Sequence, residues 1–348
     1  MGHISSLPYQ PHYLWSIFGY KPGILLGLAL FAIGALLFIP ASGMASFALF
    51  LFALFVLALG LGCLETAANP YATVLGDEQS AARRLNFAQS FNGLGSFVGP
   101  LIGGTFFFSS AATGSFSDIE VAGFDGVRIT YIAIAVVVIL LAILIARVPL
   151  PDIREHDLVM QTHTIPLRKH RHYVNGVVAL FFYVAAQVGL GAFFINYAIE
   201  HWQGLTPSKA SYWLSIAMLC FMVGRFVSTA ILQIVQARTL LACYALINVI
   251  LMGVVISGVQ FWSVMALIAA FLFMSIMFPT IFAISLERLG SHKKRGSSYL
   301  IMAIVGGAVA PVLMGRIADS ASIEQSFWLP LGCFVVVYWF ARRGSKLM

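Results

Sequence analysis

The sequence predicts an all-α polytopic membrane protein. Of its 348 residues, 60% are hydrophobic and only 9% are charged, and the mean hydropathy is +0.92. This composition excludes an ordinary water-soluble domain. Apolar runs of about 20 residues recur along the whole chain, and each is long enough to cross a hydrocarbon core about 30 Å thick. We therefore expect a bundle of membrane-spanning helices.

About ten of these runs are candidate spans. In chain order they cover residues 22–41, 45–70, 86–109, 127–146, 175–199, 207–232, 238–258, 261–285, 297–316 and 326–341. One long charged connector separates the first four spans from the last six. The sequence thus predicts an N-terminal helical half (1–147) that is incomplete, a cytoplasmic linker (148–174) and a C-terminal helical half (175–348).

Positive charge alternates from one connecting segment to the next. Most of the 20 Lys and Arg residues lie in the two terminal segments and in every second connector, including Arg83–Arg84 and Lys293–Arg295. The connectors between these segments are mainly acidic, with Asp118, Glu120, Asp125, Glu200 and Glu324. Because cytoplasmic loops carry the excess of Lys and Arg, we expect both termini and the linker to face the cytoplasm. The prediction is a multi-pass protein of the cell inner membrane.

A weak internal repeat refines the fold class. Pro70 is followed by a charged loop and a Gly-rich segment with Pro100, and Pro279 is followed by a similar loop and segment with Pro311. Parallel repeats are typical of the two halves of major facilitator transporters, which bind their substrate between the halves. Aligning the repeats within such a twelve-helix fold makes the first span of this chain the third. The sequence therefore predicts ten spans, with two helices missing before them.

Glu65 is the residue around which the functional expectation is built. No charge occurs from Met44 to Leu64, and Asn69 follows Glu65 by one helical turn. An ionisable side chain at membrane depth costs about 2.5–3.5 kcal/mol on insertion scales, so its default interpretation is functional. The alternative is that Glu65 lies at the membrane interface or accepts hydrogen bonds inside a packed bundle.

Amide and aromatic side chains supply candidates for a sugar site. Asn86, Gln89 and Asn92 recur at three-residue steps along one span, and amides both donate to and accept from hydroxyls. We expect Gln89 and Asn92 to line a cavity, with interhelical hydrogen bonding, worth about 0.6 kcal/mol per bond, as the alternative. Gln187 and Phe278 are further candidates, and a core- or lipid-facing position is their alternative. Arg225 is expected to snorkel to the cytoplasmic surface, and not to carry protons.

Other function classes find little support. His163, His170 and His172 of the linker lack metal-ligand geometry, and we expect a solvated segment that faces lipid headgroups without a metal. The four cysteines are interpreted as small buried apolar residues. The sequence contains no phosphate-binding loop, dinucleotide-binding turn or Ser-His-Asp set. We therefore expect neither an enzyme nor an ATP-driven pump, no cofactor besides a coupling proton, and no nucleic-acid partner.

Two neighbouring stretches, 62–70 (GCLETAANP) and 84–92 (RLNFAQSFN), closely resemble the fucose/galactose/glucose:proton symporters of the major facilitator superfamily. Two more stretches, 182–189 and 274–282, agree with that family. The resemblance runs from about residue 20 to the C-terminus. It implies a monomeric, twelve-helix symporter of the kind represented by L-fucose permease, which opens alternately to the two sides of the membrane.

The resemblance also implies roles for individual residues. Glu65 matches the characteristic glutamate of the family, and we expect it to carry the coupling proton. Gln89 and Asn92 match residues that contact the sugar. Asn69 and Phe278 match cavity-lining positions, although L-fucose permease has tyrosine at the position of Phe278. The first helix of the family supplies an aspartate required for proton coupling, and this chain has no residue to match it.

The sequence thus predicts symport of a proton and a neutral monosaccharide of the L-fucose, galactose or glucose type. Its expected partners are the sugar, the proton and the lipid bilayer. Two alternatives stay open. One is an uncoupled sugar facilitator, which the unmatched aspartate favours. The other is a protein that does not transport, either a sugar sensor or a truncated remnant of a transporter.

Overall fold

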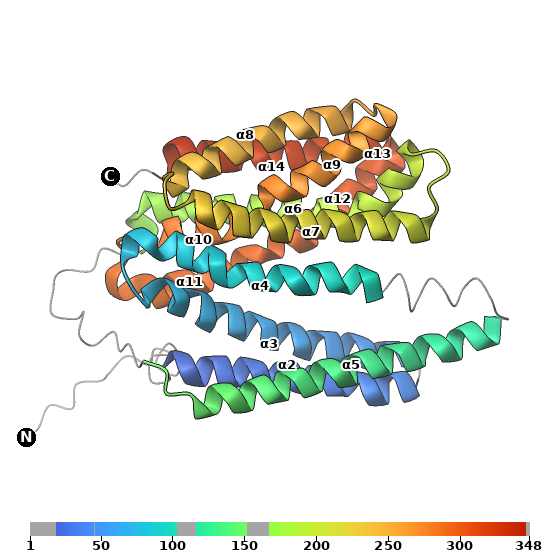
Figure 1. Ribbon diagram of the computed structural model, residues 1–348, viewed down its shortest axis with the longest axis horizontal. Helices are drawn as coiled ribbons and strands as arrows, with labels where there is room; N and C mark the ends of the chain where they lie inside the picture. The colour runs from blue at the N-terminus through green and yellow to red at the C-terminus, as the bar shows by residue number, and fades with distance from the viewer. Residues whose placement is uncertain (1–18, 45, 103–115, 152–166, 346–348) are drawn as a thin grey trace, which may run out of the picture. The chain divides into compact units, whose positions relative to one another are not determined.

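The computed structural model describes residues 19–44, 46–102, 116–151 and 167–345, which form helices and turns with no strand among them. Figure 1 shows the main helices in chain order. They are α2 (Tyr20–Gly43), α3 (Phe47–Val74), α4 (Ala81–Ile102), α5 (Phe116–Arg147), α6 (Arg171–His201), α7 (Pro207–Ile231), α8 (Ala237–Ile256), α9 (Gln260–Met274), α10 (Met277–Leu286), α11 (Lys293–Met302), α12 (Gly306–Ser320), α13 (Ile323–Ser326) and α14 (Trp328–Trp339).

The helical fold class is confirmed. Within the described ranges, nine helical segments are long and apolar enough to cross a membrane. The third predicted span, 86–109, is not among them. It corresponds to the more polar helix α4, and its residues 103–109 lie outside the described residues.

Contacts divide the chain into two compact units, and the first contains α2, most of α3 and most of α5. Helices α2 and α3 approach closely at Gly60, where an added Cβ would lie 2.4 Å from the backbone nitrogen of Phe31. Helix α2 also packs on α5, because the rings of Phe38 and Tyr131 stack with 3.7 Å between their centroids. A glycine and a pair of stacked rings thus bring these apolar helices into the van der Waals contact that holds helices together in lipid.

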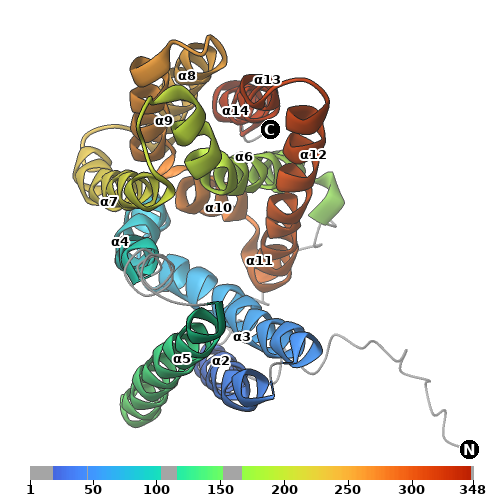
Figure 2. The same ribbon diagram turned by 90° about the vertical axis from the view of Figure 1, so that its right-hand side faces the viewer.

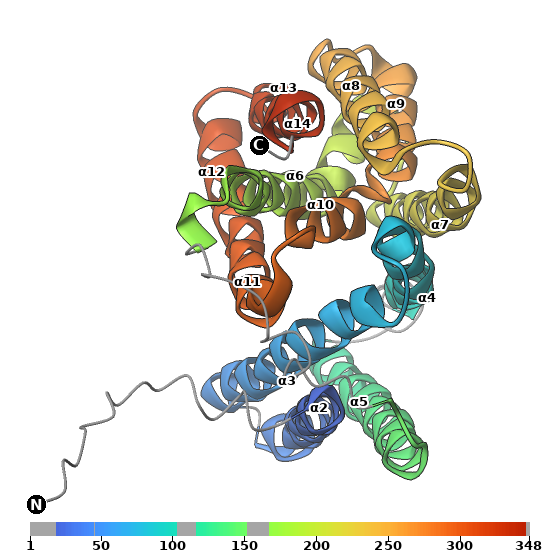
Figure 3. The same cartoon turned by 90° about the vertical axis from the view of Figure 1, so that its left-hand side faces the viewer.

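The second unit contains α4 and every helix from α6 onward. Figures 2 and 3 view this unit roughly end-on, with α6 in the middle and α7, α9, α10, α12 and α14 around it. Its core includes the fully buried rings of Tyr183, Phe194 and Phe282. Thr206 caps helix α7 because its hydroxyl accepts from the Lys209 amide, and the following proline, Pro207, is the first helical residue.

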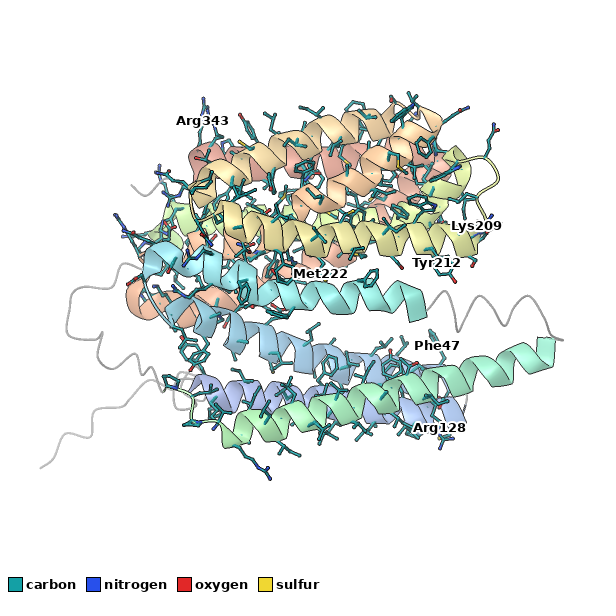
Figure 4. The ribbon with its side chains drawn as sticks, in the orientation of Figure 1. Phe47, Arg128, Lys209, Tyr212, Met222 and Arg343 are labelled. Atoms are coloured by element: carbon teal, nitrogen blue, oxygen red, sulfur yellow. The ribbon has the colours of Figure 1, made fainter. Side chains whose placement is uncertain are left out.

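Helix α4 belongs to the second unit by its contacts, although it precedes the linker in the sequence. It runs beside α7 in Figure 1 and also packs on α10. An added Cβ at Gly93 of α4 would lie 2.9 Å from the Met222 Cβ, and Figure 4 shows Met222 on the side of α7 that faces α4. Glycine therefore allows the close approach of these two helices.

Three spans expected as single helices are interrupted. The span 261–285 breaks between α9 and α10 because Pro279 lacks an N–H and its ring clashes with the carbonyl of Ser275 four residues earlier. The span 297–316 contains a 3-10 turn before Gly306, where an added Cβ would lie 2.2 Å from the backbone oxygen of Phe181. The last span starts as α13 and continues, after Phe327, as α14.

Candidate functional site

The first unit holds the carboxylate–amide pair that the sequence singled out. Glu65 is half-buried on α3, and Asn69, one turn later, is only 6% exposed. The Asn69 Nδ2 donates a hydrogen bond to the Glu65 Oε2. A lone carboxyl group in an otherwise uncharged helix thus has a donor supplied by the same helix. This donor stabilises the charged form of Glu65 through a charge-assisted hydrogen bond.

The three amides of α4 have different environments. Asn86 is fully buried, and its Nδ2 donates to the Ala82 carbonyl (2.8 Å) and to the Thr280 hydroxyl of α10 (3.1 Å). Gln89 is also buried, whereas Asn92 is exposed. Asn86 therefore joins two helices of the second unit. The expected lining of a cavity by Gln89 and Asn92 stays a prediction.

Arg225 lies beside Gln89, and its burial differs from the surface position that the sequence predicted. Its side chain is only 4% exposed, so the prediction that it snorkels to the surface is wrong. The Nη1 donates to the backbone carbonyl of Gln89 and, at 3.5 Å, to its Oε1, and the guanidinium lies 4.4 Å from the centroid of the Phe221 ring. These acceptors and the aromatic face retain the side chain inside the bundle.

Arg225 also donates a hydrogen bond at the break between α9 and α10. Its Nε donates to the Ser275 carbonyl at 2.9 Å, the carbonyl that Pro279 leaves without a helical partner. The preceding carbonyl, of Met274, accepts from the Tyr183 hydroxyl at 2.9 Å. Backbone groups left open at membrane depth need such partners, because lipid offers none. Tyr183 and Arg225 therefore stabilise an irregular segment between α9 and α10.

Gln187 and Phe278 lie on the neighbouring helices α6 and α10 of the second unit. Gln187 is half-buried, whereas Phe278 is buried and its ring lies 6.1 Å from that of Phe282 in a stacked arrangement. The predicted sugar residues of this unit thus occupy α4, α6 and α10. Two cavities of about 740 and 480 Å³ open elsewhere in the unit, and neither is lined by a predicted site residue.

Sequence reasoning missed the network formed by Arg225, Tyr183 and Ser275. Two signals could have pointed to it. An arginine within an apolar run carries the same functional presumption as a glutamate. A proline inside a predicted span marks the carbonyl four residues earlier as one that needs a new donor.

Comparison with known proteins places this architecture in a family. Residues 12–305 match the family model described as the Major Facilitator Superfamily. A "Glucose/galactose transporter" of Brucella abortus is 38% identical over 332 residues, which cover 94% of this chain and 79% of that protein. The "L-fucose-proton symporter" of Escherichia coli is 36% identical over 358 residues, covering 98% and 82% respectively.

Solved structures agree. The crystal structure of the transporter FucP in the outward conformation matches with a TM-score of 0.82 and 35% identity, covering 96% of this chain and 85% of that one. A "D-xylose-proton symporter" matches with a TM-score of 0.67 at 15% identity, covering 97% and 84%, a likeness of fold alone. The family model and the relatives lead to one conclusion: this chain belongs to the major facilitator superfamily, a family of membrane transporters and not of enzymes.

Proposed function

We propose that the chain carries a neutral monosaccharide across the cytoplasmic membrane in symport with a proton. The observation that supports this most directly is the Glu65–Asn69 pair within an otherwise uncharged stretch of α3. An intramembrane carboxyl group is costly when ionised and is neutral when protonated. The names of the sugar-transporting relatives support the monosaccharide as the second substrate.

In this mechanism Glu65 takes up a proton while the site is open to the outside. Protonation weakens the charge-assisted bond from Asn69 and adds an O–H donor at Glu65, and both the amide and the carboxyl group are suited to sugar hydroxyls. Gln89, Asn92 and Gln187 supply further amides, and Phe278 an apolar face. Hydration of Glu65 from the cytoplasm then favours the carboxylate, and the proton and sugar leave.

Proton coupling explains accumulation. Moving one elementary charge through 100 mV supplies about 2.3 kcal/mol, which is enough to concentrate a neutral sugar about fifty-fold. The alternation of basic and acidic connectors supports an orientation with the linker and both termini in the cytoplasm. We further propose that a monomer works by alternating access, with residues 1–147 and 175–348 as the two moving halves joined by the linker.

The test is the external pH of a lightly buffered suspension of cells that express the chain, as single hexoses are added. We expect alkalinisation with at least one sugar and none with Glu65→Gln, which mimics the protonated state. The same variant is expected to retain sugar counterflow. Glu200→Gln, which removes an exposed carboxylate from the end of α6, is the matched control and should behave like the parent chain.

Three results would contradict the proposal. Sugar counterflow by the parent chain without any pH change would identify an uncoupled facilitator. Alkalinisation of equal size with Glu65→Gln would remove Glu65 from the coupling mechanism. Absence of both transport and binding with every hexose would leave the sugar assignment itself without support.

A further inference from the structure

A cavity with three arginines opens at one end of the second unit. It has a volume of about 480 Å³. Its lining residues are Arg168, Arg171, Val174, Asn175, Trp339, Arg343 and Gly344. Figure 4 shows Arg343 and Lys209 at opposite ends of the helices; Lys209 lies in the first turn of α7. None of the described residues that line the cavity is acidic, so these residues give it a concentrated positive charge.

The cavity is built where α6 begins and α14 ends. Arg168 belongs to the short turn Leu167–Lys169 and Arg171 is the first residue of α6, whereas Arg343 lies in the π-helical turn Phe340–Gly344 that follows α14. A hydrogen bond of 3.0 Å from the Asn175 Nδ2 to the Gly344 carbonyl joins the two sides. The arginines are therefore held around a fixed base, although their own side chains are exposed.

Trp339 gives the cavity an apolar edge. An added Cβ at Gly344 would lie 3.0 Å from Cζ3 of this ring, so the indole packs on the glycine that closes the turn. The ring is nevertheless 44% exposed, and the neighbouring Val174 is 38% exposed. Tryptophan is enriched at the level of lipid headgroups, where its amphipathic ring meets both apolar and polar surroundings.

We propose that this cavity binds the phosphate headgroup of an anionic membrane phospholipid. Guanidinium groups bind phosphate oxygens in pairs through parallel charge-assisted hydrogen bonds. Basic pockets between transmembrane helices at the cytoplasmic surface are suited to such headgroups, and the positive-inside rule assigns this end of the helices to the cytoplasm. A free phosphate ion would use the arginines alone, whereas a lipid also covers the exposed faces of Trp339 and Val174.

The test is native mass spectrometry of the full-length chain in detergent, with added phosphatidylglycerol or with phosphatidylcholine of the same acyl chains. We expect phosphatidylglycerol adducts that the double variant Arg171→Ala/Arg343→Ala weakens by at least about tenfold, since one charge-assisted hydrogen bond is worth about that factor. Lys169→Ala/Arg342→Ala removes the same charge from nearby exposed residues that do not line the cavity. This matched control should retain the adducts.

Three results would overturn the proposal. The first is equal loss of adducts in the cavity variant and the control variant, which would indicate general attraction to basic residues. The second is equal binding of the two lipids. The third is displacement of phosphatidylglycerol by glycerol phosphate, which has no acyl chains, at a similar concentration. That result would identify a site for soluble phosphate. Arg171→Lys/Arg343→Lys retains the charge but loses the forked geometry, so partial binding is expected if a variant with alanine fails to fold.

Discussion

Arg225 of α7 and Gln89 of α4 are joined through the Gln89 backbone carbonyl as well as its side chain. A predicted sugar-binding residue is therefore positioned by a buried cation that also donates to Ser275 at the break between α9 and α10. Any change at Arg225 will affect three elements together: α4, α7 and the irregular segment of the second unit.

We expect Arg225→Met to lower the free energy of unfolding by about 1–3 kcal/mol for each buried carbonyl that loses its donor. Arg225→Lys should be intermediate, because one ammonium replaces the separate Nε and Nη1 donors. Thermal unfolding in detergent measures the effect, with Arg316→Met, at an exposed position of α12, as the control. Parent-like stability of Arg225→Met would show that other groups satisfy these carbonyls.

Tyr183→Phe removes the hydroxyl that donates to the Met274 carbonyl. We expect a loss of about 1–3 kcal/mol in unfolding free energy, because the carbonyl is left in a buried site without this donor. Tyr212→Phe is the matched control, since Tyr212 of α7 is 40% exposed, and no loss is expected there. Equal unfolding midpoints for the two variants would contradict the role given to Tyr183.

Gly306→Ala tests the close contact of α12 with α6. The added methyl group would lie 2.2 Å from the Phe181 carbonyl oxygen, so the helices must separate and we expect a severe loss of folded protein. Gly253→Ala adds the same group at a position where, beyond its own helix backbone, no atom of a described residue lies within 4 Å, and helix propensity favours it by up to about 1 kcal/mol. The yield of monodisperse protein after size-exclusion chromatography should separate the two variants clearly.

His292 predicts a dependence of stability on pH. Burial, followed by the electrostatic influence of the neighbouring His170 and Arg295, lowers the pKa of His292 below its usual value. As the pH falls through about 6.5, the unfolded chain binds the proton first, so stability decreases until the folded form is protonated as well. We expect the temperature of the unfolding midpoint to decrease as the pH is lowered from about 7.5 to about 5.5.

The variant His292→Gln is expected to show a smaller fall over the same range, because it removes the titrating group. The remaining slope then belongs to other residues of the chain. An identical fall in the parent chain and the variant would mean that His292 contributes nothing to the pH dependence.

The sequence was sufficient for the helical class and for the location of most spans because hydrophobic runs directly reflect the thickness of a bilayer. Glu65 and Asn69 were found as a pair because they lie one turn apart on one helix. The partners of Gln89 and Asn86 were not predictable, because Arg225 and Thr280 come from distant helices. Helix packing, and not local pattern, decides whether an arginine near the end of a span reaches the surface or stays buried.

Pro279 signals the helix break after Met274 in the sequence. No sequence signal indicates which side chains stabilise that break. Proline indicates only that the Ser275 carbonyl loses a helical donor. Which side chain replaces that donor depends on the packing of α6 and α7 around the break, and no short-range pattern contains that information.

The tie between Asn86 and Thr280 spans 194 residues of chain, and this has a consequence for biosynthesis. At about 5–20 residues per second, the ribosome needs roughly 10–40 s to reach Thr280 after it has made Asn86. Helix α7 is complete only about three-quarters of the way through that interval, since it ends at Ile231, and until then α4 has neither α7 nor α10 to bind. We expect the insertion machinery to shelter this helix until translation of the chain is nearly finished.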